Sequence, residues 1–270
     1  MSNPIEKYNK RAKEINSLLC VGLDADFDKL PEQYKKLGGS ESQFQFNKYI
    51  IDTTYPYASA FKPNVAFYEA RGTDGIEALK KTMNYIHANY PDVFTILDAK
   101  RADIGNTNNG YVTSIFDWLG FDAVTVNPYL GSEAIKPFLD RIDKCSIILA
   151  KTSNPGAREL QDCVLENKEI LWQHIARKVA DEWNTNNNLM IVMGATVPDD
   201  VAIARRITGE MTFLVPGIGA QGGDIKNTVT NGINKEGLGL IINSSRGIIF
   251  SGDPSGEAKK LRDEINNYRK

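Results

Sequence analysis

The chain has 270 residues, of which 41% are hydrophobic and 24% are charged, and its formal net charge is −2. This length allows one large or two small globular domains with a sizeable core. The near-neutral charge argues against nucleic acid or an anionic membrane as a partner. No apolar run approaches the roughly 20 residues of a membrane helix, and the polar N-terminus does not resemble a signal peptide.

The cysteines and histidines show no pattern of a disulfide framework or a metal site. Cys20, Cys145 and Cys163 lack metal-like or redox-like spacing, and their odd number predicts reduced thiols in a cytoplasmic protein. His87 and His174 fall inside expected helices, away from the ends of the expected strands. We therefore expect neither a histidine-bound metal nor acid–base chemistry carried out by histidine.

Eight short apolar runs alternate along the chain with segments of helical character. Most runs are continuously hydrophobic, which is typical of strands that are covered on both faces. The expected strands cover residues 18–24, 60–64, 94–100, 123–129, 145–153, 189–196, 213–219 and 239–247. Helical patterns lie between them, at residues 41–55, 75–90, 110–120, 166–183 and 197–207.

Eightfold alternation of strand and helix predicts an α/β fold, a single (β/α)8 TIM barrel over residues 1–270. Residues 1–14 are expected to form a helical or flexible N-terminal extension. An open doubly wound sheet is the main alternative. Such a sheet would need a Gly-rich loop after its first strand, whereas "CVGLDADFDKL" follows here.

The stretch "LDAKRADIGNT", residues 97–107, places three charges at the end of an expected strand. Asp98 and Lys100 are two residues apart, so regular pleating would point both to one face, while Asp103 follows in the loop. A structural ion pair, with Asp103 capping the next helix, is the simplest interpretation. Lys62, at the end of the second run, favours a pocket in which two lysines and two carboxylates alternate and fix one another's charge.

Polar residues also end several other strands, and the C-terminal ends of barrel strands form the active face. Asp24 ends the first run, residues 151–153 end the fifth, and Arg246 ends the eighth. The Gly-rich stretch "VPGIGAQGG", residues 215–223, allows backbone N–H groups to approach an anion. Because loops after strands seven and eight commonly hold a phosphate in such barrels, we expect a phosphate site there.

These motifs together resemble the orotidine 5′-phosphate decarboxylase family, particularly its longer bacterial and protozoal branch. "LDAKRADIGNT" matches the signature D-x-K-x-x-D-I-x-x-T, and "FKPN", "KTSNP", "VPGIGAQGG" and "SSRG" resemble the other blocks in the expected order. The resemblance implies a homodimeric barrel that decarboxylates orotidine monophosphate to uridine monophosphate. This reaction is the last step of pyrimidine synthesis, and the resemblance implies that it needs no metal or organic cofactor.

The resemblance also implies a catalytic role for each charged residue of the motif. Lys100 would protonate C6 as CO2 leaves, and Asp98 would lie beside the substrate carboxylate. Lys62 would link the charged network and reach the ribose, and Asp103 would come from the partner subunit. A lysine ammonium suits this chemistry because it can stabilise carbanion character at C6 and then donate a proton.

The remaining implied residues would bind the nucleotide. Asp24 would hold ribose hydroxyls, and Ile104 and Thr107 would come from the partner subunit. Thr152 or Ser153 would recognise the pyrimidine edge.

The phosphate would lie on the far side of the site from the lysines. Gln221 and Arg246 would bind it, helped by backbone N–H groups near Gly223 and Ser245, and Pro216 would line the base pocket. Phosphate binding would supply energy for ordering the charged residues.

Two other functions remain as alternatives. A Mg²⁺-dependent sugar-phosphate decarboxylase or aldolase could share the D-x-K-x-x-D motif, but it would need an additional acidic ligand. In the present sequence the second strand ends in Lys62-Pro63-Asn64, and the next acid is Glu69. A barrel that binds nucleotide without turnover is the other alternative, because a fold alone does not prove activity.

Overall fold

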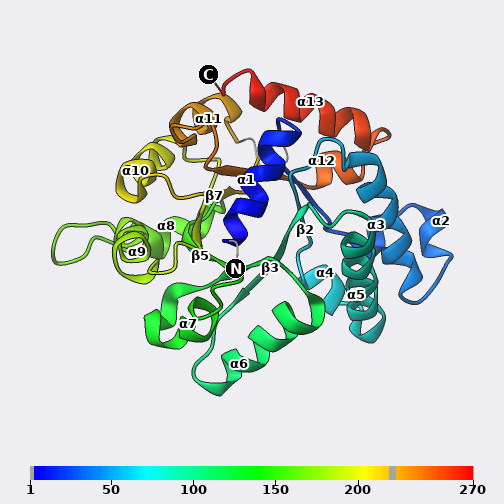
Figure 1. The fold of residues 1–270 in the computed structure, drawn as a ribbon, viewed down its shortest axis with the longest axis horizontal. Helices are drawn as coiled ribbons and strands as arrows, with labels where there is room; N and C mark the ends of the chain where they lie inside the picture. Colours follow the sequence, from blue (N-terminus) through cyan, green and yellow to red (C-terminus); the bar gives the residue numbers. More distant parts are fainter. Residues whose placement is uncertain (1–2, 219–222, 270) are drawn as a thin grey trace.

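The computed structural model describes residues 3–218 and 223–269. In these residues, eight parallel strands close into a barrel in sequence order, with β1 hydrogen-bonded to both β2 and β8. Helices surround the barrel (Figure 1). The predicted (β/α)8 architecture is therefore confirmed.

Each of the eight expected apolar runs coincides with one strand, and only β3 continues past its run, by one residue. The strands are β1 (Leu19–Gly22), β2 (Ala60–Lys62), β3 (Phe94–Arg101), β4 (Ala123–Val126), β5 (Cys145–Lys151), β6 (Leu189–Met193), β7 (Phe213–Val215) and β8 (Leu240–Ser244). Six of these strands are buried along their whole length, as their uninterrupted hydrophobicity predicts. Most of the expected runs extend past the strand end, and their last residues form the loops that carry the polar side chains.

The helices pack around the strands. They are α1 (Pro4–Glu14), α2 (Glu32–Lys35), α3 (Glu41–Thr54), α4 (Ala66–Glu69), α5 (Gly72–Asn89), α6 (Asn106–Val112), α7 (Gly131–Leu139), α8 (Arg158–Gln161), α9 (Leu171–Lys178), α10 (Pro198–Thr208), α11 (Ile225–Gly232), α12 (Arg246–Ile249) and α13 (Pro254–Asn266). α6 and α9 continue as π-helical turns over Thr113–Leu119 and Val179–Trp183. Pro198 begins α10 within the expected helical segment 197–207, and two acids follow in its first turn. All helices of the described ranges are too short or too polar to cross a membrane.

Helix α1 crosses the barrel at the N-terminal ends of the strands (Figure 1). The buried Tyr8 hydroxyl donates a hydrogen bond to the carbonyl of Leu240, the first residue of β8. Arg11 donates to the carbonyl of Ala58, just before β2, and Lys7 pairs with Asp122, just before β4. The opposite end of the barrel is therefore the one left open for a site.

We expect Tyr8→Ala to lower the free energy of unfolding by about 3–5 kcal/mol, because it removes a fully buried aromatic side chain. Tyr8→Phe should cost only about 1 kcal/mol, since it removes the hydrogen bond alone. Urea denaturation would measure both variants. A loss below about 1 kcal/mol for Tyr8→Ala would contradict the role of α1 in closing the barrel.

Candidate active site

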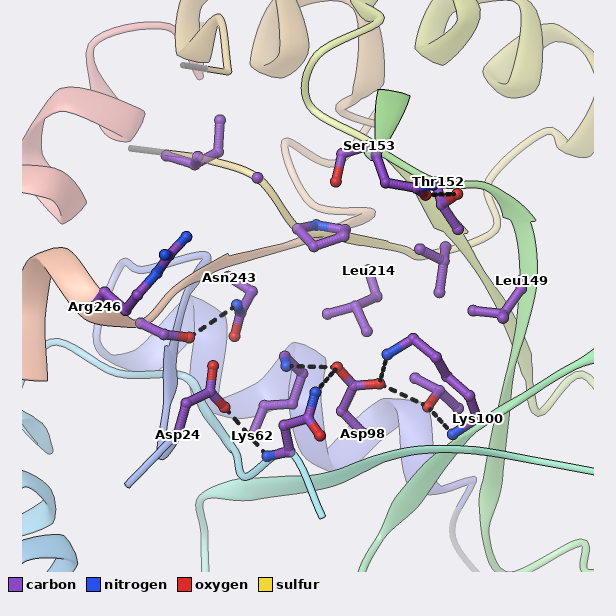
Figure 2. Close-up of a pocket in the computed structure, with 18 residues that line it drawn as sticks. Asp24, Lys62, Asp98, Lys100, Leu149, Thr152, Ser153, Leu214, Asn243 and Arg246 are labelled. Carbon is purple, nitrogen blue, oxygen red and sulfur yellow. Dashed lines mark hydrogen bonds and ion pairs between the residues drawn. The ribbon is translucent and has the colours of Figure 1, made fainter. Parts of the chain in front are cut away.

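A cavity of about 300 Å³ opens at the C-terminal ends of the strands. Its wall combines charged and amide side chains with an apolar patch from β5, β6 and β7 (Figure 2). The described residues that line it are Asp24, Lys62, Asn64, Asp98, Lys100, Thr125, Leu149, Thr152, Ser153, Asn154, Val192, Leu214, Pro216, Gly217, Ile218, Asn243, Ser245 and Arg246. The prediction that polar strand ends meet in one pocket is thus supported by the geometry.

Asp98 lies between two lysine ammonium groups (Figure 2). Lys100 Nζ is 2.6 Å from Asp98 Oδ1, and Lys62 Nζ is 3.0 Å from Asp98 Oδ2. The Thr125 hydroxyl is 3.0 Å from Oδ1, and the Asn64 amide is 3.5 Å from Oδ2. Both carboxylate oxygens of Asp98 therefore accept hydrogen bonds from a cation and from a neutral donor.

The pKa values in this cluster favour the charged forms. Burial of Asp98 opposes its ionisation, but Lys62 and Lys100 outweigh burial and hold the pKa of Asp98 well below its usual range. Burial likewise disfavours the Lys62 ammonium, yet Asp98 and Asp24 raise the pKa of Lys62 above its ordinary value. At neutral pH, Asp98 is a carboxylate and Lys62 is an ammonium.

The backbone at the end of β3 differs from the regular pleat that the sequence predicted. Lys100 has a φ of +48°, and the pairing of β3 with β4 shifts register between Leu97 and Arg101. Lys100 still reaches Asp98, but it does so from a bulge and not by strand alternation. Asp98 and Lys100 both face the cavity, as expected, although the regular pleat from which this was predicted does not continue to Lys100.

Asp103 does not join the charged cluster of its own chain. Its carboxylate accepts the backbone N–H of Ile104 at 2.7 Å. The alternative that Asp103 caps the next helix is also wrong, since α6 begins after Gly105 without a side-chain cap. Ile104 and Thr107 are exposed, and none of these three residues is among those that line the cavity.

The residues expected at the pyrimidine and ribose lie in the cavity wall. The Thr152 hydroxyl donates to Asn154 and accepts from Gln161, whereas the Ser153 hydroxyl has no hydrogen-bond partner within the described part of the chain. Ser153 is therefore the one with a hydroxyl available to a ligand. Asp24 Oδ1 accepts the backbone N–H of Asn64 at 3.2 Å, and its other oxygen faces the cavity (Figure 2).

At the expected phosphate site, Arg246 lines the cavity on the side away from Lys100 (Figure 2). Ser245, the preceding residue, also lines the cavity. Gly22 of β1 leaves room for Ser245, because a Cβ built at Gly22 would lie 1.8 Å from the Ser245 hydroxyl oxygen. The N–H of Gly223 donates to the Gly217 carbonyl at 3.1 Å, so this particular N–H is already engaged.

Three further expectations at the rim have different outcomes. Pro216 lines the cavity as expected. Gln221 lies outside the described residues. Lys151, which the sequence grouped with the polar strand ends, is buried and pairs with Asp162 away from the cavity.

Comparison with known proteins identifies the family. A model of the orotidine 5′-phosphate decarboxylase / HUMPS family matches residues 17–261. The chain belongs to this family. A Christiangramia forsetii orotidine 5′-phosphate decarboxylase is 48% identical over 243 residues, which cover 90% of this chain and 88% of the relative. One from Cellvibrio japonicus is 43% identical over 272 residues, with 98% of each chain covered.

A solved structure agrees with the sequence relatives. The Leishmania donovani OMP decarboxylase matches with a TM-score of 0.88 at 37% identity and covers 99% of both chains. The family resemblance inferred from the five sequence blocks is therefore confirmed.

The sequence analysis did not identify several residues that line the cavity of this family member. Thr125 interrupts an apolar run, and Asn243 stands before the expected phosphate loop. A polar residue inside an otherwise apolar strand was the available signal for both. The apolar side chains of Leu149, Val192 and Leu214 could not be distinguished from the barrel core by sequence alone.

We expect that Asp98→Asn makes the free energy of unfolding less dependent on pH in the acid range. The folded-state pKa of Asp98 is lowered, so its stabilising contribution is present above about pH 5 and is lost as pH falls. Between about pH 5 and pH 3, the free energy of unfolding should therefore fall further in the wild type than in Asp98→Asn, by about 1 kcal/mol. Urea denaturation at several pH values would measure the slopes.

Asp140→Asn is the matched control, because Asp140 is exposed and pairs with Lys136 one helical turn away. It should keep the wild-type slope. Equal slopes for Asp98→Asn and the wild type would contradict the charge assignment.

Proposed function

We propose that this chain decarboxylates orotidine 5′-phosphate to uridine 5′-phosphate and CO2, the last step of UMP synthesis. The observation that carries the proposal is the Lys62–Asp98–Lys100 cluster in a cavity whose opposite side holds Arg246. Relatives at 42–48% identity are named for this activity. A substrate with an anionic carboxylate at one end and a phosphate at the other suits this separation of cations.

Lys100 is the proposed acid. The C6–carboxylate bond breaks, its electron pair remains at C6, and the Lys100 ammonium transfers a proton to C6 as CO2 departs. Asp98, 2.6 Å from Lys100 Nζ, orients the ammonium and keeps the proton available until the carbanion develops. Lys62, which is buried, fixes the other oxygen of Asp98 and so holds the carboxylate in place. The amine formed at Lys100 then regains a proton from solvent.

The remaining cavity residues position the nucleotide. Arg246 with Ser245 and Gln221 would bind the phosphate, and Asp24 would bind ribose hydroxyls. The free hydroxyl of Ser153 would recognise the pyrimidine edge, against the wall formed by Pro216. Binding at the phosphate end supplies energy that holds C6 against Lys100.

We propose that the active unit is a homodimer in which Asp103, Ile104 and Thr107 enter the partner's cavity. Three observations support this arrangement. Asp103 does not line the cavity of its own chain, and Ile104 is 61% exposed. Tyr129 is likewise 85% exposed on the loop that follows the neighbouring strand β4. Apolar side chains exposed on adjacent loops are typical of a surface that another subunit covers.

The magnesium-dependent sugar-phosphate alternative has less support. Glu69, the acid that follows β2, forms an ion pair with Arg101 and is not among the described residues lining the cavity. Asn64 occupies the cavity wall after β2, and its amide donates to Asp98. We infer a reaction without metal or organic cofactor, and turnover that is unaffected by EDTA would support it. The free thiols of the chain favour a cytoplasmic location.

Lys100→Ala should lower turnover of orotidine 5′-phosphate at least ~100-fold, because a positioned acid contributes ~10²–10⁴-fold. Loss of the substrate's near-ultraviolet absorbance, with and without EDTA, measures the rate. Lys136→Ala removes an exposed lysine of α7 and is the matched control, with wild-type turnover expected. Circular dichroism should show that both variants are folded. Retained activity in Lys100→Ala would overturn the acid assignment.

Mixing the inactive homodimers Asp103→Asn and Lys100→Ala should restore activity. If Asp103 acts across the interface, each heterodimer has one site with both substitutions and one site with neither. A statistical mixture should then recover about a quarter of wild-type sites, which is the expected share for one intact site in half of the dimers. Absence of recovery, despite subunit exchange shown by mass spectrometry, would place the whole site within one chain.

A further inference from the structure

The bulge that presents Lys100 is held together by one hydroxyl group. Between Leu97 and Arg101 the ladder from β3 to β4 is interrupted. The backbone N–H groups of Ala99 and Lys100 both donate to Thr125 Oγ1, at 3.0 and 2.9 Å. Thr125 belongs to β4 and is 1% exposed. Its hydroxyl therefore replaces the strand partners that these two partly buried N–H groups lose at the bulge.

Thr125 Oγ1 makes a third hydrogen bond, with Asp98, and the chemistry of a hydroxyl group fixes which of the two is the donor. A threonine hydroxyl has one proton and two lone pairs. The two N–H donors occupy both lone pairs, so the proton must point elsewhere. Asp98 Oδ1 is 3.0 Å away and is the acceptor. Thr125 thus donates to the same oxygen that Lys100 Nζ contacts at 2.6 Å.

We propose that Thr125 is a positioning residue for the decarboxylation. A single side chain sets the left-handed backbone at Lys100 and the orientation of the Asp98 carboxylate, and so fixes the Lys100 ammonium relative to the substrate. This inference rests on the proposed function, since it concerns Lys100, the proposed acid of that reaction. Displacement of a catalytic group by about 1 Å can lower a rate by ~10²-fold.

The comparison that isolates this role is Thr125→Val against Thr125→Ser. Valine keeps the shape but removes the hydroxyl, and serine keeps the hydroxyl. Thr95→Val on β3 is the matched control. Thr95 is also 1% exposed, and its hydroxyl donates to the carboxylate of Asp122 at 2.9 Å. Asp122 precedes β4, so Thr95 lies at the end of the barrel away from the cavity.

Steady-state kinetics on Thr125→Val, Thr125→Ser and Thr95→Val, with the affinity for uridine 5′-phosphate, would test the proposal. Thr125→Val should lower kcat by roughly 30–100-fold, since it displaces the acid, while product affinity changes less than about threefold. Thr125→Ser should stay within about threefold of wild-type kcat. Thr95→Val should lower stability and leave kcat of the folded enzyme within the same threefold range.

Several outcomes would overturn the role of Thr125. One is a near-wild-type kcat in Thr125→Val. Another is a kcat in Thr125→Ser as low as that of Thr125→Val. The third is a loss of kcat in Thr95→Val as large as that in Thr125→Val. If Thr125→Val does not fold, the serine variant decides, because a large loss of kcat despite the retained hydroxyl contradicts the proposal.

Failure of the proposed function can be distinguished from failure of the inference about Thr125. If the proposed function is wrong, the wild type does not release CO2 from orotidine 5′-phosphate. A crystal structure of Thr125→Val would still test the inference. A Lys100 that keeps its positive φ and its contact with Asp98 would refute it, whereas a Lys100 that leaves the left-handed region would support it.

Discussion

The contact of Asp98 with two ammonium groups is the interaction on which the rest of the site depends. A carboxylate that is 13% exposed is costly unless cations and hydrogen bonds compensate it. Lys62 comes from β2 and Lys100 from the end of β3 itself, and the closed barrel makes these two strands neighbours. The pairing of these strands in the barrel therefore holds both ammonium groups at fixed distances from the Asp98 carboxylate. Removal of either lysine would leave Asp98 partly uncompensated in a buried position.

The charge balance of the cavity matches a polyanionic substrate. Lys62, Lys100 and Arg246 are cationic and Asp24 and Asp98 are anionic, so the described lining carries an excess of one positive charge. A nucleotide with a phosphate and a carboxylate would reverse that sign when it binds. Within the cavity the charges are also segregated, because Arg246 lies on the side opposite Lys100 (Figure 2). The separation lets the phosphate be bound without neutralising Lys100, the proposed acid.

The sequence was sufficient to predict the barrel and the position of its active face, for identifiable reasons. Continuous apolar runs mark strands buried on both sides, and a charge that ends such a run has to lie at the strand end. Lys62, Asp98 and Arg246 were found in this way. Lys151 follows the same pattern, yet it is buried against Asp162, because sequence cannot show which side of the sheet a strand end faces. Asp103 lies outside the cavity of its own chain, because its position depends on the tertiary course of the loop after β3, which no local pattern encodes.

The bulge at the end of β3 is the clearest case in which a local rule fails. A lysine with positive φ is disfavoured for its backbone conformation, and two N–H groups leave the strand ladder at the same point. Such features persist only where surrounding contacts over-determine them, and they cluster at functional sites. Here the compensation comes from the Thr125 hydroxyl and from the ion pair with Asp98. The groups that make the backbone at Lys100 tolerable are thus the groups that aim its ammonium, so the strain and the orientation of the proposed acid have one common cause.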